Sequence, residues 1–248
     1  MKKNIFRLFF LVQIFMFSTD FLIAQTSGPS VTPVVSFDAK DDEGNTEHYD
    51  MTQGGGTVTV QAPVSFEAKT NVVSGDWTMT YIRWTITGKG TDWEDEWIRE
   101  TENFSLSFDR AGQYSFVYDV VFENDDEEIE YTNSDEPMKL VLSESALSCP
   151  DGFSPNDDHI NDYFRMTTFK SIVKLEGGIF NRWGKKLFTF TLDNAETGWD
   201  GRVNGDYVKD GAYLLYINAY GSEGRHYEIK KAINVLKGWR ETGESSGN

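Results

Sequence analysis

Residues 113–123 have the sequence QYSFVYDVVFE, in which an aromatic or β-branched residue occupies every second position. These alternating residues are Tyr114, Phe116, Tyr118, Val120 and Phe122. Successive side chains of a β-strand point to opposite faces of its sheet, so this period of two predicts a strand with one buried face.

Shorter segments on both sides of this strand show the same alternation. Ile82, Trp84 and Ile86 share one face of residues 81–87, and residues 104–109 alternate in the same way. Three further strands are predicted at residues 34–37, 64–68 and 138–142. Glycine-rich or asparagine-rich breaks at residues 54–56, 88–90 and 124–126 separate the runs. No stretch in this part of the chain has a helical period, so the pattern predicts an all-β domain.

The central Trp84 and the later segment Ala111-Gly112-Gln113-Tyr114 make this region resemble the PKD-like and immunoglobulin-like domains of bacterial surfaces. The resemblance implies an antiparallel β-sandwich. It also implies a tyrosine corner, in which the Tyr114 ring is buried and its hydroxyl group caps the backbone.

The beginning of the chain predicts export. Lys2, Lys3 and Arg7 precede an apolar run at residues 8–17, and Ala24-Gln25 offers a small residue for cleavage. This order is typical of a Sec signal peptide, and the run is shorter than the roughly 20 apolar residues that span a bilayer. We therefore expect a signal peptide at residues 1–25, with an uncleaved anchor as the alternative, and no integral membrane protein.

Charge divides the rest of the chain into two parts. Residues 26–148 carry 7 basic and 25 acidic residues, a net charge of −18, whereas residues 149–248 carry 13 and 14, a net charge of −1. Phosphates and anionic lipids would repel the acidic part, so we expect neither nucleic acid nor a membrane surface as its ligand. Cys149 is the single cysteine, so no internal disulfide can form.

The composition changes at Cys149, and five sequence blocks follow in a fixed order. They are CPDGFSPNDDHINDYF at residues 149–164, IFNRWGKKLF at 179–188, GWDGR at 198–202, DGAYLLY at 210–216 and KAINVL at 231–236. In this order and spacing they resemble the gliding-motility-associated C-terminal domain, the type B sorting signal of the type IX secretion system. The resemblance implies Sec export, passage through the type IX translocon, and docking on an outer-membrane partner of the PorP/SprF family.

The blocks also have the local chemistry of turns and strands. Pro155 fixes a backbone angle beside Asn and Asp residues that cap their own backbone, and Gly184 permits a tight turn before residues 187–188. About seven short strands over this region predict a second β-sandwich. The chain is therefore expected to hold two consecutive antiparallel, immunoglobulin-like sandwiches at residues 26–148 and 149–238, followed by a flexible tail at 239–248.

The resemblance assigns the sorting and docking function to residues in these blocks, and the basic residues among them, with Lys230 and Lys231, are candidates for the docking face. The assigned residues are Phe153, Ser154, Pro155, Asn156, Asn161, Asp162, Phe180, Asn181, Arg182, Trp183, Gly184, Lys185, Lys186, Trp199, Asp200, Gly201, Gly211 and Tyr213.

The first block departs from the family pattern, which places Gly at the positions of Asp157 and His159. A left-handed backbone at either position would be strained, although Asp and His tolerate it better than most residues. Asp157, Asp158, Asn161 and Asp162 have oxygen ligands at calcium-like spacing. We therefore keep a calcium site as one hypothesis and a structural Asx turn as the other, and we expect no further cofactor.

Two features of the acidic domain favour ligand contact or a structural role. Trp93 and Trp97, between two predicted strands, could stack on a sugar or enter a partner's pocket, or could cover the sandwich edge. Residues 123–130 hold six carboxylates, which could attract calcium or form a solvated hairpin tip.

Motifs of enzymatic chemistry are missing from the sequence. His48, His159 and His226 are far apart, and the sequence contains neither a nucleophile-elbow motif nor a phosphate-binding glycine loop. We therefore expect a non-enzymatic surface interaction protein, tethered by its C-terminal domain. One alternative is a structural accessory of the secretion or gliding machinery, and another is a small glycan-binding or glycan-cleaving protein.

Overall fold

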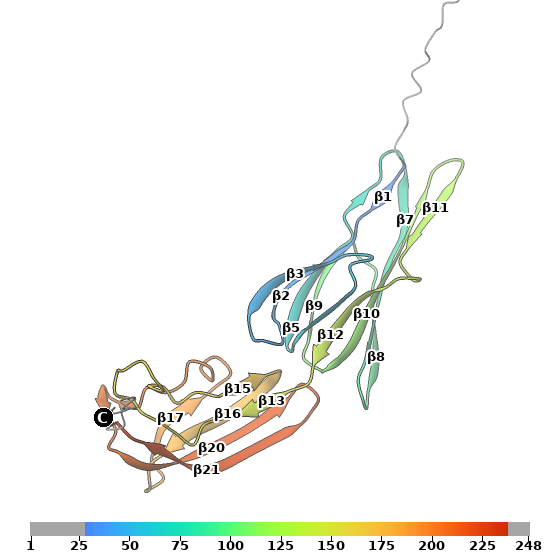
Figure 1. Ribbon diagram of the computed structural model, residues 1–248. Helices are drawn as coiled ribbons and strands as arrows, with labels where there is room; N and C mark the ends of the chain where they lie inside the picture. Colours follow the sequence, from blue (N-terminus) through green and yellow to red (C-terminus); the bar gives the residue numbers. More distant parts are fainter. Residues whose placement is uncertain (1–27, 238–248) are drawn as a thin grey trace, which may run out of the picture.

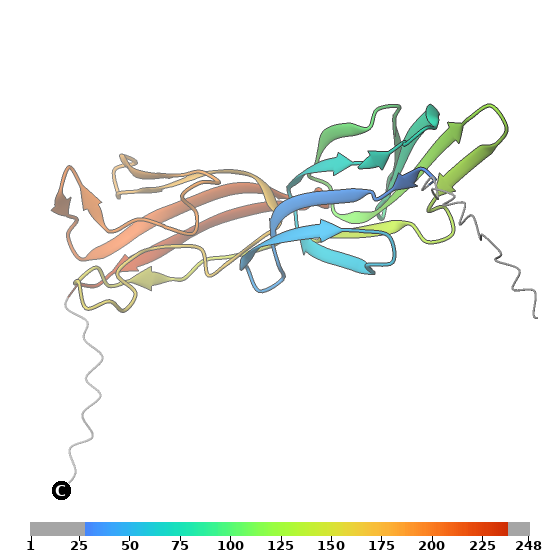
Figure 2. The same ribbon diagram turned by 90° about the horizontal axis from the view of Figure 1, so that it is seen from above.

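The computed structural model describes residues 28–237, which form strands, turns and loops but no helix, and hence no helix that could cross a bilayer. Two domains lie end to end (Figures 1 and 2). Strand β1 (Ser30–Val31) lies at the outer end of the first domain, and β21 (His226–Val235) ends at the outer end of the second. The expected signal peptide and flexible tail lie outside the described residues. The all-β fold class is confirmed.

The first sheet of the first domain has four antiparallel strands in the order β3-β2-β5-β9. Their bounds are β2 (Val34–Lys40), β3 (Thr46–Met51), β5 (Val64–Lys69) and β9 (Asn103–Phe108). A small ribbon of β1 and β6 (Val72–Val73) extends the outer end of this domain.

The second sheet has the order β4-β12-β10-β7-β8, and β11 also pairs with β10. Its strands are β4 (Thr57–Gln61), β7 (Thr78–Lys89), β8 (Glu94–Arg99), β10 (Gly112–Glu123), β11 (Glu128–Thr132) and β12 (Met138–Ser143). The pairing of β4 with β12 is parallel, and the other pairings in this sheet are antiparallel. The strand predicted at residues 113–123 is confirmed as β10, at the centre of the sheet.

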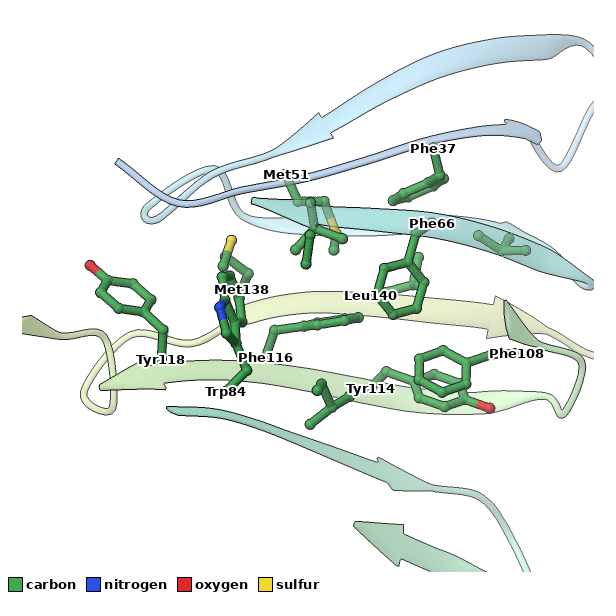
Figure 3. Close-up of a cluster of buried hydrophobic side chains, with 14 of the residues drawn as sticks. Phe37, Met51, Phe66, Trp84, Phe108, Tyr114, Phe116, Tyr118, Met138 and Leu140 are labelled. Carbon is green, nitrogen blue, oxygen red and sulfur yellow. The ribbon is translucent and has the colours of Figure 1, made fainter. Parts of the chain in front are cut away.

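Aromatic and aliphatic side chains from both sheets fill the space between them (Figure 3). Trp84 is fully buried, and its indole N–H donates a 3.0 Å hydrogen bond to the hydroxyl group of Thr70. The hydroxyl group of Tyr114 donates a 2.7 Å hydrogen bond to the carbonyl oxygen of Arg110, which is the expected tyrosine corner. Burial of this phenol strongly raises its pKa, because burial disfavours the phenolate.

The segment that contains Trp97 is a strand, although the sequence placed it between two strands. β8 pairs with β7 at the edge of the second sheet, with Trp97 opposite the buried Ile86. Its three acidic residues are exposed. Because Glu94, Asp95 and Glu96 are charged and consecutive, the segment lacks the alternation of apolar and polar residues from which strands are predicted.

The second domain contains one five-stranded sheet in the order β14-β21-β20-β16-β17. Its strands are β14 (Gly152–Phe153), β16 (Ile172–Phe180), β17 (Lys186–Phe190), β20 (Gly211–Gly221) and β21. Loops and two short ribbons accompany this sheet: β13 (Ala146–Ser148) with β15 (Thr168–Lys170), and β18 (Arg202–Val203) with β19 (Asp206–Tyr207). The core of this domain includes Phe153, Phe164, Phe190 and Trp199.

The two domains contact one another through polar groups around Ser171, which is buried and has a left-handed backbone angle of 47°. Its hydroxyl oxygen accepts a hydrogen bond of 3.2 Å from the amide of Ala62 and lies 3.2 Å from the hydroxyl group of Ser143. Its amide donates to the side chain of Gln61. At the rim, Lys170 forms an ion pair of 2.6 Å with Asp42. Together these bonds fix the second domain to the end of the first.

Candidate docking surface of the C-terminal domain

The turn at residues 181–185 joins β16 to β17 at the end of the second domain that faces away from the first. The opposite end of β16 leads into Ser171 at the domain junction, so the strand spans the domain. The side-chain oxygen of Asn181 accepts hydrogen bonds of 3.0 Å from the amides of Trp183 and Lys185. Gly184 adopts a backbone angle of 80°, which favours glycine. These bonds hold the turn so that Trp183 projects into solvent, 77 % exposed.

Trp183 forms one side of a groove of about 820 Å³, called here the tip groove. The guanidinium group of Arg182 lies 4.6 Å from the centre of the indole ring, within the range of a cation–π contact. Leu187, Tyr207 and Tyr213 contribute apolar and aromatic surface to the groove. Tryptophan and arginine are among the residue types that are enriched at the energetic centres of protein–protein interfaces.

The other wall of the tip groove is held by hydrogen bonds. The hydroxyl group of Tyr213 donates a 2.7 Å bond to the carbonyl oxygen of Lys209, and burial raises the pKa of this phenol. Arg202 lies 4.1 Å from the centre of the Tyr207 ring and donates a 2.6 Å bond to its hydroxyl group. On this side, the tip groove is therefore bounded by side chains that have hydrogen-bond partners. On the other side it is bounded by the turn at residues 181–185.

Several residues of the predicted sorting motif stabilise the fold and are not available to a partner. Trp199 is 2 % exposed and donates its indole N–H to the carbonyl oxygen of Arg202 at 2.9 Å. Gly201 has a backbone angle of 77°, and a Cβ atom there would lie 2.8 Å from a ring carbon of Pro155. Phe153 is buried against Phe164 and Trp199.

The loop at residues 154–162 closes on the carboxylate of Asp162. This group accepts bonds of 2.8–3.0 Å from the amides of Asn156, Asp157 and His159. Burial alone would raise the pKa of Asp162, but the three amide donors together lower it. Asp157 and His159 adopt left-handed backbone angles of 61° and 68°, so both occupy the conformation that the family pattern assigns to glycine.

The proposed calcium ligands already accept hydrogen bonds from groups of the domain. The carboxylate of Asp158 accepts from the side chain of Asn156 and from the amide of Ile160, and Asp157 accepts from the Tyr207 hydroxyl group at 2.8 Å. No group of three or more His, Cys, Asp or Glu side chains within residues 28–237 could hold a metal ion. This geometry favours the structural Asx turn, and the calcium site remains a hypothesis without geometric support.

The basic candidates of the docking face do not form one cluster. Lys186 lies 5.7 Å from the centre of the Phe180 ring, near the turn. Lys231 instead donates to the carbonyl oxygen of Cys149 at 2.9 Å and to Asp151 at 2.6 Å. Lys230 forms an ion pair of 2.5 Å with Glu228. Lys231 thus acts within the domain, and the turn retains the stronger candidates.

Trp93 and Trp97 in the acidic domain pack on Tyr114 and neighbouring rings. The centre of Trp97 lies 4.8 Å from that of Phe108, and Arg110 lies 4.1 Å from the centre of the Trp93 ring. Both indoles are half-buried, so the geometry favours the role of covering the sandwich edge. The carboxylate-rich segment forms the turn and flanks of the β10–β11 hairpin at the outer end of the molecule (Figure 1).

Sequence reasoning missed Tyr207, Val208 and Leu187 as groove residues. Leu187 lay in a quoted block but was interpreted as part of a returning strand, and residues 207–208 lay between blocks. The one available signal was an aromatic and an aliphatic residue in an otherwise polar stretch just before Asp210-Gly211.

Comparisons with known proteins identify the second domain. Residues 147–235 match the family model of the CHU_C type IX secretion signal domain. No curated protein matches the chain. Among solved structures, a tetra-tandem repeat from the extending region of a large adhesion protein is similar over 86 % of this chain and 68 % of the other. The identity is 12 % and the TM-score 0.25. The sorting-domain resemblance is confirmed for the matched segment: the C-terminal domain carries the type IX secretion signal of the CHU_C family.

Proposed function

We propose that this chain is a non-enzymatic interaction protein of the cell surface whose tip groove docks on an outer-membrane protein of the PorP/SprF type. A type IX secretion signal implies export to the cell surface or secretion, and interaction with the secretion machinery. Beyond this, we propose the site of docking, the class of the partner, and an outward-facing position for the acidic domain.

The exposure of Trp183 is the observation that carries this proposal. Trp183 is 77 % exposed. The other aromatic residues of the motif are buried or half-buried, and they are Phe153, Phe180, Trp199 and Tyr213. Exposing a large indole leaves its apolar surface in water, and covering it with a partner would recover that hydrophobic free energy. The adjacent Arg182 adds a donor that could bind carboxylates of the partner.

The arrangement of the domains is consistent with tethering. The turn with Trp183 lies at one end of the molecule, and the acidic β10–β11 hairpin lies at the other (Figure 1). A partner bound at the tip groove would therefore leave the acidic hairpin facing outward, available to an external ligand.

Export of Trp183→Ala in cells tests the docking site. We expect loss of surface accessibility and loss of co-purification with the outer-membrane partner, while the melting temperature stays within about 1–2 °C, since exposed substitutions change stability little. Tyr163→Ala is the matched control, because Tyr163 is also exposed, at 51 %, and does not line the tip groove. Normal export and retention of Trp183→Ala would contradict the proposal.

The same purification separates the alternatives. Recovery of an outer-membrane protein alone, with a tag after Gln25 accessible on intact cells, supports a tethered surface module. Stoichiometric recovery of core secretion components, together with failed secretion of unrelated cargo in a deletion strain, would instead identify an accessory of the machinery. Turnover in a screen of glycans and peptides would contradict the non-enzymatic assignment.

A further inference from the structure

Strand β9 forms one edge of the first sheet and is paired with β5 on one flank only. Thr70 donates its amide to the carbonyl oxygen of Glu102 at 3.0 Å, just before the paired residues. Antiparallel strands alternate between residues that bond to the neighbour and residues that point away. The backbone groups of Asn103, Ser105 and Ser107 therefore point to the open edge, and the hydroxyl group of Thr101 bonds the carbonyl oxygen of Asn103.

This edge lacks the charges that protect the other edges of the domain. β3 carries Glu47, His48 and Asp50, and β8 carries three acidic residues and Arg99, whereas β9 has the sequence NFSLSF. Charges on an edge strand prevent pairing with another chain. β4 also lacks charge, but it is shorter and β2 of the other sheet lies close to it. β9 is thus the longest uncharged edge strand within residues 28–237.

The sequence of β9 is symmetric about Leu106. Residues 104–108 have the sequence FSLSF, which is the same in both directions. Two copies of the strand, placed antiparallel with Leu106 opposite Leu106, would therefore put Phe104 opposite Phe108 and Ser105 opposite Ser107. A two-fold axis places the same patch of both copies against itself, and here this symmetry also makes the opposed residues alike.

The hydrogen-bonding pattern agrees with this register. It places outward-pointing Ser105 opposite outward-pointing Ser107, so their amides and carbonyl groups can bond directly.

We infer that β9 is a homotypic strand-pairing surface, through which two copies of the acidic domain join their first sheets into one continuous sheet. The inference does not depend on the docking function of the C-terminal domain. The net charge of −18 opposes the approach of two such domains, and salt screens this repulsion. Association should therefore become stronger as ionic strength rises from about 0.01 M to 0.15 M, unlike association driven by opposite charges.

Sedimentation analysis of the purified exported protein tests the inference. We expect a reversible dimer at physiological salt. Ser107→Pro removes an outward-pointing amide that β5 does not use, and proline is tolerated at such positions of an edge strand. It should raise the dissociation constant at least about tenfold, because the two-fold axis removes the bond twice. Ser107→Lys, which adds two like charges at the interface, is a second variant that keeps the backbone intact.

The register has its own test. Leu106→Cys in a Cys149→Ser background should form a disulfide-linked dimer, since directly opposed residues that are not hydrogen-bonded have Cα atoms about 4.5 Å apart. A protein that remains monomeric at about 100 μM in physiological salt would overturn the inference, and so would a dimer that Ser107→Pro and Ser107→Lys leave unchanged. NMR chemical shifts of the β9 amides could also change only when an extended peptide from another protein is added. That result would show that the edge binds a strand of another protein and would overturn the inference.

Discussion

The backbone amide of Ala62 in the first domain donates a 3.2 Å hydrogen bond to the hydroxyl oxygen of Ser171 in the second. Both residues are buried, and the same hydroxyl group lies 3.2 Å from that of Ser143. One side chain of the second domain thus contacts polar groups on two segments of the first domain, and it does so from a left-handed backbone conformation that is uncommon for serine.

Ser171→Ala should loosen the junction between the domains. The substitution leaves the buried Ala62 amide without its acceptor, which costs about 1–3 kcal/mol. Small-angle scattering should then show a broader distribution of interdomain distances. Ser65→Ala is the control, since it removes an exposed hydroxyl pair with Ser107 and should leave the scattering unchanged. An unchanged scattering curve for Ser171→Ala would show that the remaining contacts suffice.

Tyr114→Phe should destabilise the first domain by about 0.5–1.5 kcal/mol, the typical net contribution of one hydrogen bond. The ring remains stacked on Phe108, with 4.2 Å between their centres, so the change isolates the bond to Arg110. Urea unfolding measures the difference. Tyr81→Phe, at an exposed tyrosine, should change the free energy of unfolding little, and equal effects of the two would refute this account.

Trp199→Ala should destabilise the second domain by about 3–5 kcal/mol, as expected when a large aromatic residue is removed from a core. Its indole contacts Phe153, Phe188 and Tyr213 and donates one hydrogen bond. Loss of export by this variant would be accompanied by unfolding, which calorimetry detects. Trp183→Ala should lose export without that signature, and this contrast distinguishes a folding residue from a docking residue.

The loop at residues 154–162 should open in acid. The lowered pKa of Asp162 means that folding favours its carboxylate. The stabilisation is present above the unfolded-state pKa, near 3.8, and is lost as pH falls through the lower folded-state pKa. Amide chemical shifts of Asn156, Asp157 and His159 should move together in that range. In Asp162→Asn this common transition should be absent, and its persistence would assign the transition to another group.

His48 should titrate above its ordinary pKa of 6.5. Its Nδ1–H donates a hydrogen bond of 2.7 Å to the carboxylate of Asp38, which is the main cause of the raised pKa, and Asp50 also attracts the charged form. Because the pKa of His48 is raised in the folded state, its protonation stabilises the fold. This stabilisation is fully present below the unfolded-state pKa of 6.5 and is lost as pH rises through the folded-state pKa. NMR titration should show a lower His48 pKa in Asp38→Asn and a smaller decrease in Asp50→Asn. Equal decreases would argue against the hydrogen bond as the main cause.

The strands of the core could be predicted because their apolar residues alternate. β10, β7, β5 and β12 bury one face and expose the other, and this directly produces a period of two in the sequence. The edge strands β3 and β8 carry charged side chains that are exposed to water. Their sequences therefore lack the alternation of apolar and polar residues. Edge strands are therefore the elements that local pattern alone does not reveal.

The candidate site could be predicted only in part, for a related reason. The turn around Trp183 is contiguous in sequence, and its motif could be recognised. The opposite wall comes from residues 207–213, and only the packing of the second domain brings it to the turn. Sequence also could not separate Trp199, which is buried, from Trp183, which is exposed, because both precede a turn glycine or aspartate in similar polar surroundings.

The parallel pairing of β14 with the end of β21 has a consequence for the order of biosynthesis. Gly152 and Phe153, the first strand of the sheet, find their partners at Asn234 and Val235, some eighty residues later. A nascent chain that stops anywhere earlier leaves β14 without its neighbour and β20 without one of its two, so the sheet cannot close. The strand that completes the sheet of the secretion signal domain is thus the last of its strands to be synthesised, so this sheet can form only after residue 235 has been made.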